Sequence, residues 1–151
     1  MRARLVVAIV LVLIASVVLA APATAKQTNK MQPVMGKAKL TYDLDKNYWS
    51  GSISGGVRGT MQMVGLDFAY PVEMVFTESF AITTPRGVIE GYVIGIFPGP
   101  AFSSCGWVTN ATGRWSKMVE WMMYQRGKVT ESGGTSVARS DVVFMPRLRV
   151  K

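Results

Sequence analysis

The stretch WSGSISGGVRGTMQM, residues 49–63, alternates without a break between two kinds of position. From Trp49 to Met63 the odd positions hold apolar residues or glycine, and the even positions hold polar residues or glycine. A period of two is typical of an extended strand with one apolar face and one solvent-facing side, as in an antiparallel sheet that buries a single side. This stretch therefore predicts sheet structure.

The two central glycines, Gly55 and Gly56, are a strong signal for a two-residue hairpin turn. Such a turn would pair polar positions with apolar ones and mix the two faces. A three-residue loop over residues 54–56 keeps the faces separate and pairs Trp49 with Met61. One long strand, kinked at its glycines, also keeps them separate. Both alternatives place the stretch in a curved sheet.

Four further segments alternate in the same way, over residues 37–45, 72–82, 87–97 and 141–151. Shorter strands are expected over residues 101–109 and 128–131. Such amphipathic strands, joined by short polar connections, predict an all-β antiparallel fold. We expect a closed or nearly closed barrel of about eight strands in residues 37–151, with a β-sandwich as the alternative.

A helical spacing interrupts this pattern once. Trp115, Met118, Val119 and Met122 lie three, four and seven residues apart, which predicts a short helix or turn near residues 115–123. The same residues also admit a strand, because apolar residues alternate there as well. We expect the helix to plug or flank the sheet.

The N-terminal segment has the features of a secretory signal. Arg2 and Arg4 precede an apolar run over residues 5–21, and small residues suited to cleavage stand at the end of residues 1–25. The sequence therefore predicts an exported protein with a signal peptide over residues 1–25 and a flexible polar linker over residues 26–36. An uncleaved membrane anchor is the alternative, because the run is nearly long enough to span a bilayer. Membrane contact is expected only through this segment.

Composition excludes several classes of function. The chain has 17 Lys and Arg against 9 Asp and Glu, with the basic residues spread along it, so we expect no nucleic-acid partner. It contains no histidine and no H-E-x-x-H or C-x-x-C spacing, and therefore no metal site or cofactor is predicted. Cys105, the single cysteine, has no histidine to activate it and is expected to be a buried structural thiol.

Glu78 is the one carboxylate on the apolar face of residues 72–82. A carboxylate in such a position is costly unless it is paired, hydrogen-bonded or protonated. Pairing Ile82 with Gly87 would place Glu78 opposite Gly91, whose missing side chain would leave room over the carboxylate. Glu78 is either an acid–base or ligand-orienting group of raised pKa, or a structural residue at the barrel rim. Its structural partner would be Arg58, Arg86 or Arg114.

The glycines of two strands follow one pattern. G-x-I-x-G-x-V-x-G occurs over residues 51–59 and again over residues 87–95. The repeat indicates two strands that meet the same steric demand, a concave inner face where larger side chains would collide.

Two segments resemble allene oxide cyclase and dirigent-like barrels. Residues 80–95 carry FAIT, a short loop and GVIEGYVIG, which is similar to the family's "LAIT-loop-G-x-F-E-G-x-x-G" segment. Residues 111–115, ATGRW, are similar to the "A-T-G-R-F" phrase of small secreted bacterial barrels of that type. The resemblance implies an eight-stranded barrel with an apolar lumen, often trimeric. In the plant enzymes this lumen guides cyclisation of a fatty-acid epoxide, and in dirigent proteins it steers radical coupling.

The chain departs from that family at residues 84–87, TPRG, where the family has a glycine pair. No catalytic residue is carried over, since the family's acidic and cysteine positions have no clear match here.

Three functions follow. The first is an exported, non-catalytic barrel that binds a small apolar ligand. The resemblance implies that it assembles as a homo-oligomer, a trimer. The lumen would be lined by Trp49, Met61, Met63, Met74, Phe76, Phe80, Gly91 and Phe97. The second is an isomerase or cyclase that confines a reactive apolar substrate, with Glu78 as its polar group. The third is a structural or surface-interaction protein with a filled core. Asn110 begins an N-A-T sequon and is a candidate glycosylation site.

Overall fold

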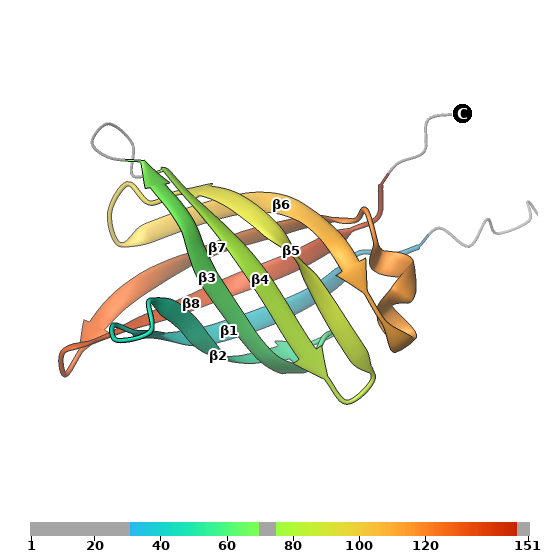
Figure 1. The fold of residues 1–151 in the computed structure, drawn as a ribbon, viewed down its shortest axis with the longest axis horizontal. Coiled ribbons are helices and arrows are strands. Elements are labelled where there is room, and N and C mark those ends of the chain that lie inside the picture. The colour runs from blue at the N-terminus through green and yellow to red at the C-terminus, as the bar shows by residue number, and fades with distance from the viewer. Residues whose placement is uncertain (1–30, 70–74, 148–151) are drawn as a thin grey trace, which may run out of the picture. The chain divides into compact units, whose positions relative to one another are not determined.

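The computed structural model describes residues 31–69 and 75–147, which form eight antiparallel strands and one short 3-10 helix (Figure 1). The strands are β1 (Val34–Asp43), β2 (Tyr48–Gly55), β3 (Gly59–Ala69), β4 (Val75–Thr84), β5 (Gly87–Ile96), β6 (Ala101–Ala111), β7 (Met122–Ser132) and β8 (Thr135–Met145), and the helix η1 (Gly113–Met118) joins β6 to β7. Each strand pairs with the next in the chain, and β8 pairs back with β1. The predicted eight-stranded antiparallel barrel is confirmed, and the sandwich alternative is wrong.

The core lies inside the barrel because alternate residues of each strand point inward. In β1, Gly36, Ala38 and Leu40 are buried, while Lys37 and Lys39 between them are exposed. Closure pairs the backbone of every neighbouring strand and hides the sheet edges that an open sheet would present to other chains. The period of two in the sequence is therefore the alternation between lumen and exterior.

Residues 49–63 fold as a hairpin, but both of the forms predicted for them are wrong in detail. Trp49 pairs with Met63 rather than with Met61, so the register differs by two residues from the three-residue loop. Gly55 has a φ of 109°, a conformation that suits glycine, and the connection continues through the buried Val57 to β3. A shift of two keeps every side chain on its predicted face.

The β4–β5 hairpin is also shifted by two residues. Thr84 pairs with Gly87, so the predicted pairing of Ile82 with Gly87 is wrong and Ile82 lies opposite Ile89 instead. The Thr84 hydroxyl accepts a hydrogen bond from the Arg86 backbone N–H (3.0 Å) and donates one to the Gly87 carbonyl (2.8 Å). These two bonds close a tight two-residue turn where a four-residue loop was expected.

Two boundaries differ from the sequence prediction. β1 begins at Val34, so the last residues of the predicted linker belong to the sheet. The predicted helix is present as η1, Gly113–Met118, but β7 begins at Met122. The helix and strand alternatives thus each hold for one part of that segment. The predicted signal or anchor lies outside the described residues, within which no helix is long and apolar enough to cross a membrane.

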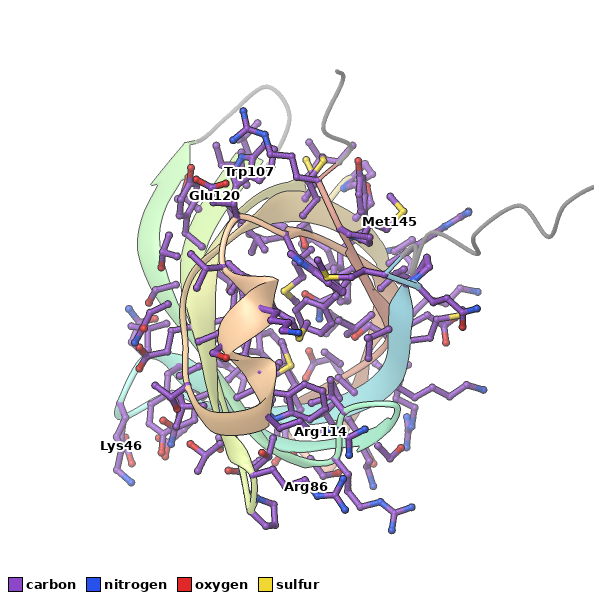
Figure 2. The ribbon with its side chains drawn as sticks, turned by 90° about the vertical axis from the view of Figure 1, so that its right-hand side faces the viewer. Lys46, Arg86, Trp107, Arg114, Glu120 and Met145 are labelled. Carbon is purple, nitrogen blue, oxygen red and sulfur yellow. The ribbon has the colours of Figure 1, made fainter. Side chains whose placement is uncertain are left out.

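The two ends of the barrel are built from different connections. One end, called the plugged end here, has the β2–β3 and β4–β5 turns and η1; the other, called the open end, has the β1–β2, β5–β6 and β7–β8 turns. Figure 2 looks down the barrel at the plugged end and shows the helix lying across the mouth. Trp115 and Met118 of η1 are buried, as is Trp121 after it. The indole N–H of Trp115 donates a hydrogen bond to the Thr84 hydroxyl (2.9 Å), which fastens the plug to β4.

A candidate ligand site in the barrel lumen

The lumen contains a cavity of about 500 Å³ that reaches the loops of the open end. Such a volume lies within the usual range of small-molecule sites, about 300 to 1,000 Å³. Its aromatic lining consists of Tyr42, Trp49, Phe76, Phe97 and Phe102, and its polar lining of Asn47, Thr77, Glu78 and Gln125. Leu40, Met63, Gly65, Val129 and Ala138 complete the wall. The cavity is therefore mostly apolar, with a few polar groups.

The structure places the predicted lining residues in three groups. Trp49, Met63, Phe76 and Phe97 line the cavity. Met61 and Phe80 are buried nearer the plugged end, where they belong to the packed core, and Gly91 stands in the wall beside Phe80. Met74 lies outside the described residues. The sequence did not single out Phe102, which points inward from β6.

Phenylalanine rings lie against glycines of the neighbouring strand. The cross-strand pairs are Phe76 with Gly95, Phe80 with Gly91, and Phe102 with Gly127. A Cβ atom at Gly91 would stand 2.8 Å from the Phe80 ring, and one at Gly127 would stand 2.9 Å from the Phe102 ring. Each would also collide with a backbone carbonyl oxygen of the strand on its other side, that of Trp107 or of Arg139. The glycines thus make room both for the rings and for the close approach of the next strand. The steric role predicted for Gly91 is correct in kind, but it makes room for Phe80 and not for Glu78.

Glu78 points into the cavity from β4, between Phe76 and Phe80 on the same face. Its cross-strand neighbours are Gly65 of β3 and Val93 of β5, so its predicted position opposite Gly91 is wrong. Val93 is fully buried, whereas a Cβ atom at Gly65 would meet no atom within 4 Å. The open space beside the carboxyl group is therefore on the Gly65 side.

Burial in this apolar lumen raises the pKa of Glu78 from 4.5 to about 7, because removal of water disfavours the charged carboxylate. The ion pairs in the described part of the chain join Lys46 to Asp43 and Arg147 to Glu120, and none includes Glu78. The arginines predicted as its structural partners stand at the plugged end. Near neutral pH the carboxyl group is therefore partly protonated, and it can then donate as well as accept a hydrogen bond.

A buried amide supplies a second polar group. Gln125 of β7 is only 3% exposed and lines the cavity. Its side-chain amide donates to the Ser140 hydroxyl at 2.9 Å, and the Ser104 hydroxyl lies 3.5 Å from its carbonyl oxygen. Gln125 fell between the predicted helix and the predicted strand over residues 128–131. The alternation of Met123, Gln125 and Gly127 was the signal that could have found it.

Two other predicted residues lie on the outside of β6. Cys105 is exposed, so the prediction of a buried thiol is wrong; the inward positions are those of Ser104 and Gly106. Asn110 is exposed, and its side-chain amide donates a hydrogen bond to the carboxylate of Glu90 (2.7 Å). Glycosylation of Asn110 stays a prediction. Within the described ranges, no group of three or more Cys, Asp and Glu side chains could hold a metal ion.

The chain was compared with protein-family models, with curated proteins and with solved structures. None of the three comparisons finds a match. Function must therefore be inferred from the cavity and its side chains.

Proposed function

We propose that this protein is an exported barrel that binds a small apolar ligand in its lumen and carries out no catalysis. The observation that supports this proposal is the cavity of about 500 Å³, which is lined mainly by apolar and aromatic side chains and reaches the open end. A barrel of eight strands is wide enough to hold one small ligand. A filled core, as expected for a structural protein, fits this cavity less well.

The lining defines the ligand's chemistry. Trp49, Phe76 and Phe102 offer apolar surface to its body, while Glu78 and Gln125 offer polar contacts to a hydroxyl, carbonyl or amide group. Burial of apolar surface contributes about 25 cal/mol per Å², so a ligand that buries about 250 Å² gains about 6 kcal/mol before the costs of binding. We therefore expect apolar contact to supply most of the binding free energy, with one or two hydrogen bonds adding about 1 kcal/mol each.

The deciding experiment is the native mass of the protein purified from the exported fraction of its own host, followed by release and identification of any bound molecule. A stoichiometric apolar adduct supports the proposal. A bare polypeptide mass, together with a lumen that binds no hydrophobic dye, contradicts it. The same measurement on Gly65→Leu tests the location of the site. This variant adds a side chain to the open space beside Glu78, and it should remain folded but no longer bind the molecule.

Export rests on the predicted signal peptide. N-terminal sequencing of the exported protein should begin at Lys26. A chain that keeps residues 1–25 and sediments with membranes would favour the anchored alternative, in which the barrel is held at a membrane through that segment alone.

The second candidate is an isomerase or cyclase of the allene oxide cyclase or dirigent-like type. The observation that favours it is the Glu78 carboxyl group, whose pKa of about 7 suits proton transfer near neutral pH. The resemblance of residues 80–95 and 111–115 to these barrels supports the same class and a trimeric assembly. Glu78→Gln separates the candidates: unchanged ligand binding with lost turnover favours the enzyme, and no turnover of any bound molecule by the unmodified protein favours the binding protein.

A further inference from the structure

A second hollow, of about 420 Å³, lies outside the core at the plugged end. It is lined by Gly55, Gly56, Arg58, Thr84, Pro85, Arg86, Arg114 and Trp115. We propose that this hollow binds a phosphate group carried by a small molecule or by a lipid headgroup. The site does not depend on the lumen, which opens at the other end of the barrel.

Three arginines from three separate connections meet at this hollow. Arg58 belongs to the β2–β3 connection, Arg86 to the β4–β5 turn and Arg114 to η1. All three are exposed. Figure 2 shows Arg86 and Arg114 on the same side of the barrel mouth. Residues 56 positions apart in the sequence, from 58 to 114, are thus brought to one place by barrel closure.

The backbone beneath the arginines is fixed. The N–H of Arg114 donates a hydrogen bond to the Arg86 carbonyl (2.9 Å), which joins the start of η1 to the β4–β5 turn. Gly113, with a φ of 58°, lies so close to Arg86 that a side chain at this position would collide with the turn. The Arg86 N–H is in turn held by the Thr84 hydroxyl. The backbones of Arg86 and Arg114 are therefore held side by side, so their side chains start from neighbouring points.

Within residues 31–69 and 75–147, no acidic side chain neutralises the charge at this hollow. None of the residues that line it is acidic, and the ion pairs of the described residues involve neither Arg58, Arg86 nor Arg114. Gathering like charges costs free energy that a bound anion would recover. Guanidinium groups donate paired hydrogen bonds to tetrahedral oxyanions, and three of them suit a dianionic phosphate better than a carboxylate.

The rest of the hollow suits a phosphate ester better than free phosphate. Arg114 lies over the Trp115 ring, 5.6 Å from its centroid, and this cation–π contact helps to orient the guanidinium. Pro85 and Trp115 provide apolar surface beside the charged groups. The volume leaves space beyond the phosphate for the group that carries it. We therefore expect an ester with an apolar or aromatic part to bind more tightly than inorganic phosphate.

The test is calorimetric titration of the full-length protein with inorganic phosphate and with phenyl phosphate. Phenyl phosphate should bind and should displace inorganic phosphate. Each of Arg58→Gln, Arg86→Gln and Arg114→Gln should weaken it by about tenfold, the size of one charge-assisted hydrogen bond. Arg139→Gln is the control, since Arg139 is exposed on β8, away from the hollow, and its loss changes the net charge equally.

Two further arms locate the source of the phosphate. Sedimentation with phosphatidylcholine vesicles that contain phosphatidic acid, lost in Arg86→Gln, would support a lipid headgroup; binding of phenyl phosphate alone would support a soluble ester. Gly65→Leu, which adds a side chain to the lumen, should change neither result, so this proposal and the lumen proposal fail separately. Absence of binding in both arms, or an equal loss in Arg139→Gln, overturns the proposal.

Discussion

The open and plugged ends of the barrel differ in structure, although the same eight strands form both. At the open end, the connections leave a cavity of about 500 Å³ with Glu78 in its wall. At the plugged end, η1 lies across the mouth, Trp115 and Met118 fill the interior, and the hollow that remains is on the outside and basic. The strands thus set the diameter of the barrel, while the connections decide whether an end is filled or hollow.

Trp115 of η1 should contribute more to stability than Glu78, Gly91 or Arg86. Trp115→Ala removes a buried indole and its hydrogen bond to Thr84, and should lower the free energy of unfolding by about 3 to 5 kcal/mol. Denaturant unfolding measures this loss. Trp107→Ala, on the partly exposed outer wall of β6, is the control and should cost less. Equal losses would show that the plug contributes no more than an outer-wall tryptophan.

The carboxyl group at the open end should make stability depend on pH. Because the pKa of Glu78 rises to about 7 on folding, the unfolded chain loses this proton at lower pH than the folded chain does. The contribution of the protonated Glu78 to the free energy of unfolding is fully present below pH 4.5 and is lost as pH rises through about 7. Glu78→Gln does not titrate, so at about pH 8 it should be up to about 3 kcal/mol more stable than the unmodified protein.

Thermal unfolding across this pH range measures the effect. At about pH 4 the two proteins should differ little, since the carboxyl group is then protonated in both states. A constant difference between them at every pH would mean that the carboxyl group is solvated in the folded protein.

Two glycines test the contrast between filled and hollow regions with the same substitution. Gly91→Ala adds a methyl group that collides with the Trp107 carbonyl oxygen of β6 and with the Phe80 ring, and should cost at least about 1 to 3 kcal/mol. Gly65→Ala adds the same group to open space and should change stability by less than about 0.5 kcal/mol. The denaturant midpoints of the two variants, each against the unmodified protein, measure these changes in stability. A large loss at Gly65 would indicate that the cavity wall is packed there.

The arginines of the plugged end should affect stability least. Arg86→Gln should change the free energy of unfolding by no more than about 0.5 kcal/mol, because its side chain is exposed. Any gain in stability from this substitution should shrink as salt is added, since salt screens repulsion between the arginines. Denaturant unfolding at low and high ionic strength measures this dependence. A loss that salt does not alter would assign Arg86 a packing role.

Much of the fold could be predicted because strand alternation is a local property. Leu40, Met63 and Phe80 each lie on the predicted inner face, and Glu78 was predicted to share it. Half of the predicted lumen residues line the cavity for the same reason: a side chain's face depends only on its place within its own strand. The predicted burial of Cys105 was wrong because β6 alternates only weakly between apolar and polar residues. The inward positions of β6 hold Ser104 and Gly106 beside Val108.

What the sequence alone determined is therefore the inner and outer faces of most strands and an antiparallel fold of about eight strands, for which a barrel was expected and a sandwich stayed open. The register was decided only in the tertiary structure, because a shift of two residues leaves the alternating pattern unchanged. Hydrogen bonds in the turns, such as those of the Thr84 hydroxyl, select one register, and that register places Gly65 rather than Gly91 beside Glu78. The meeting of Arg58, Arg86 and Arg114 depends on the same closure, since no local pattern brings three distant connections to one end of a barrel.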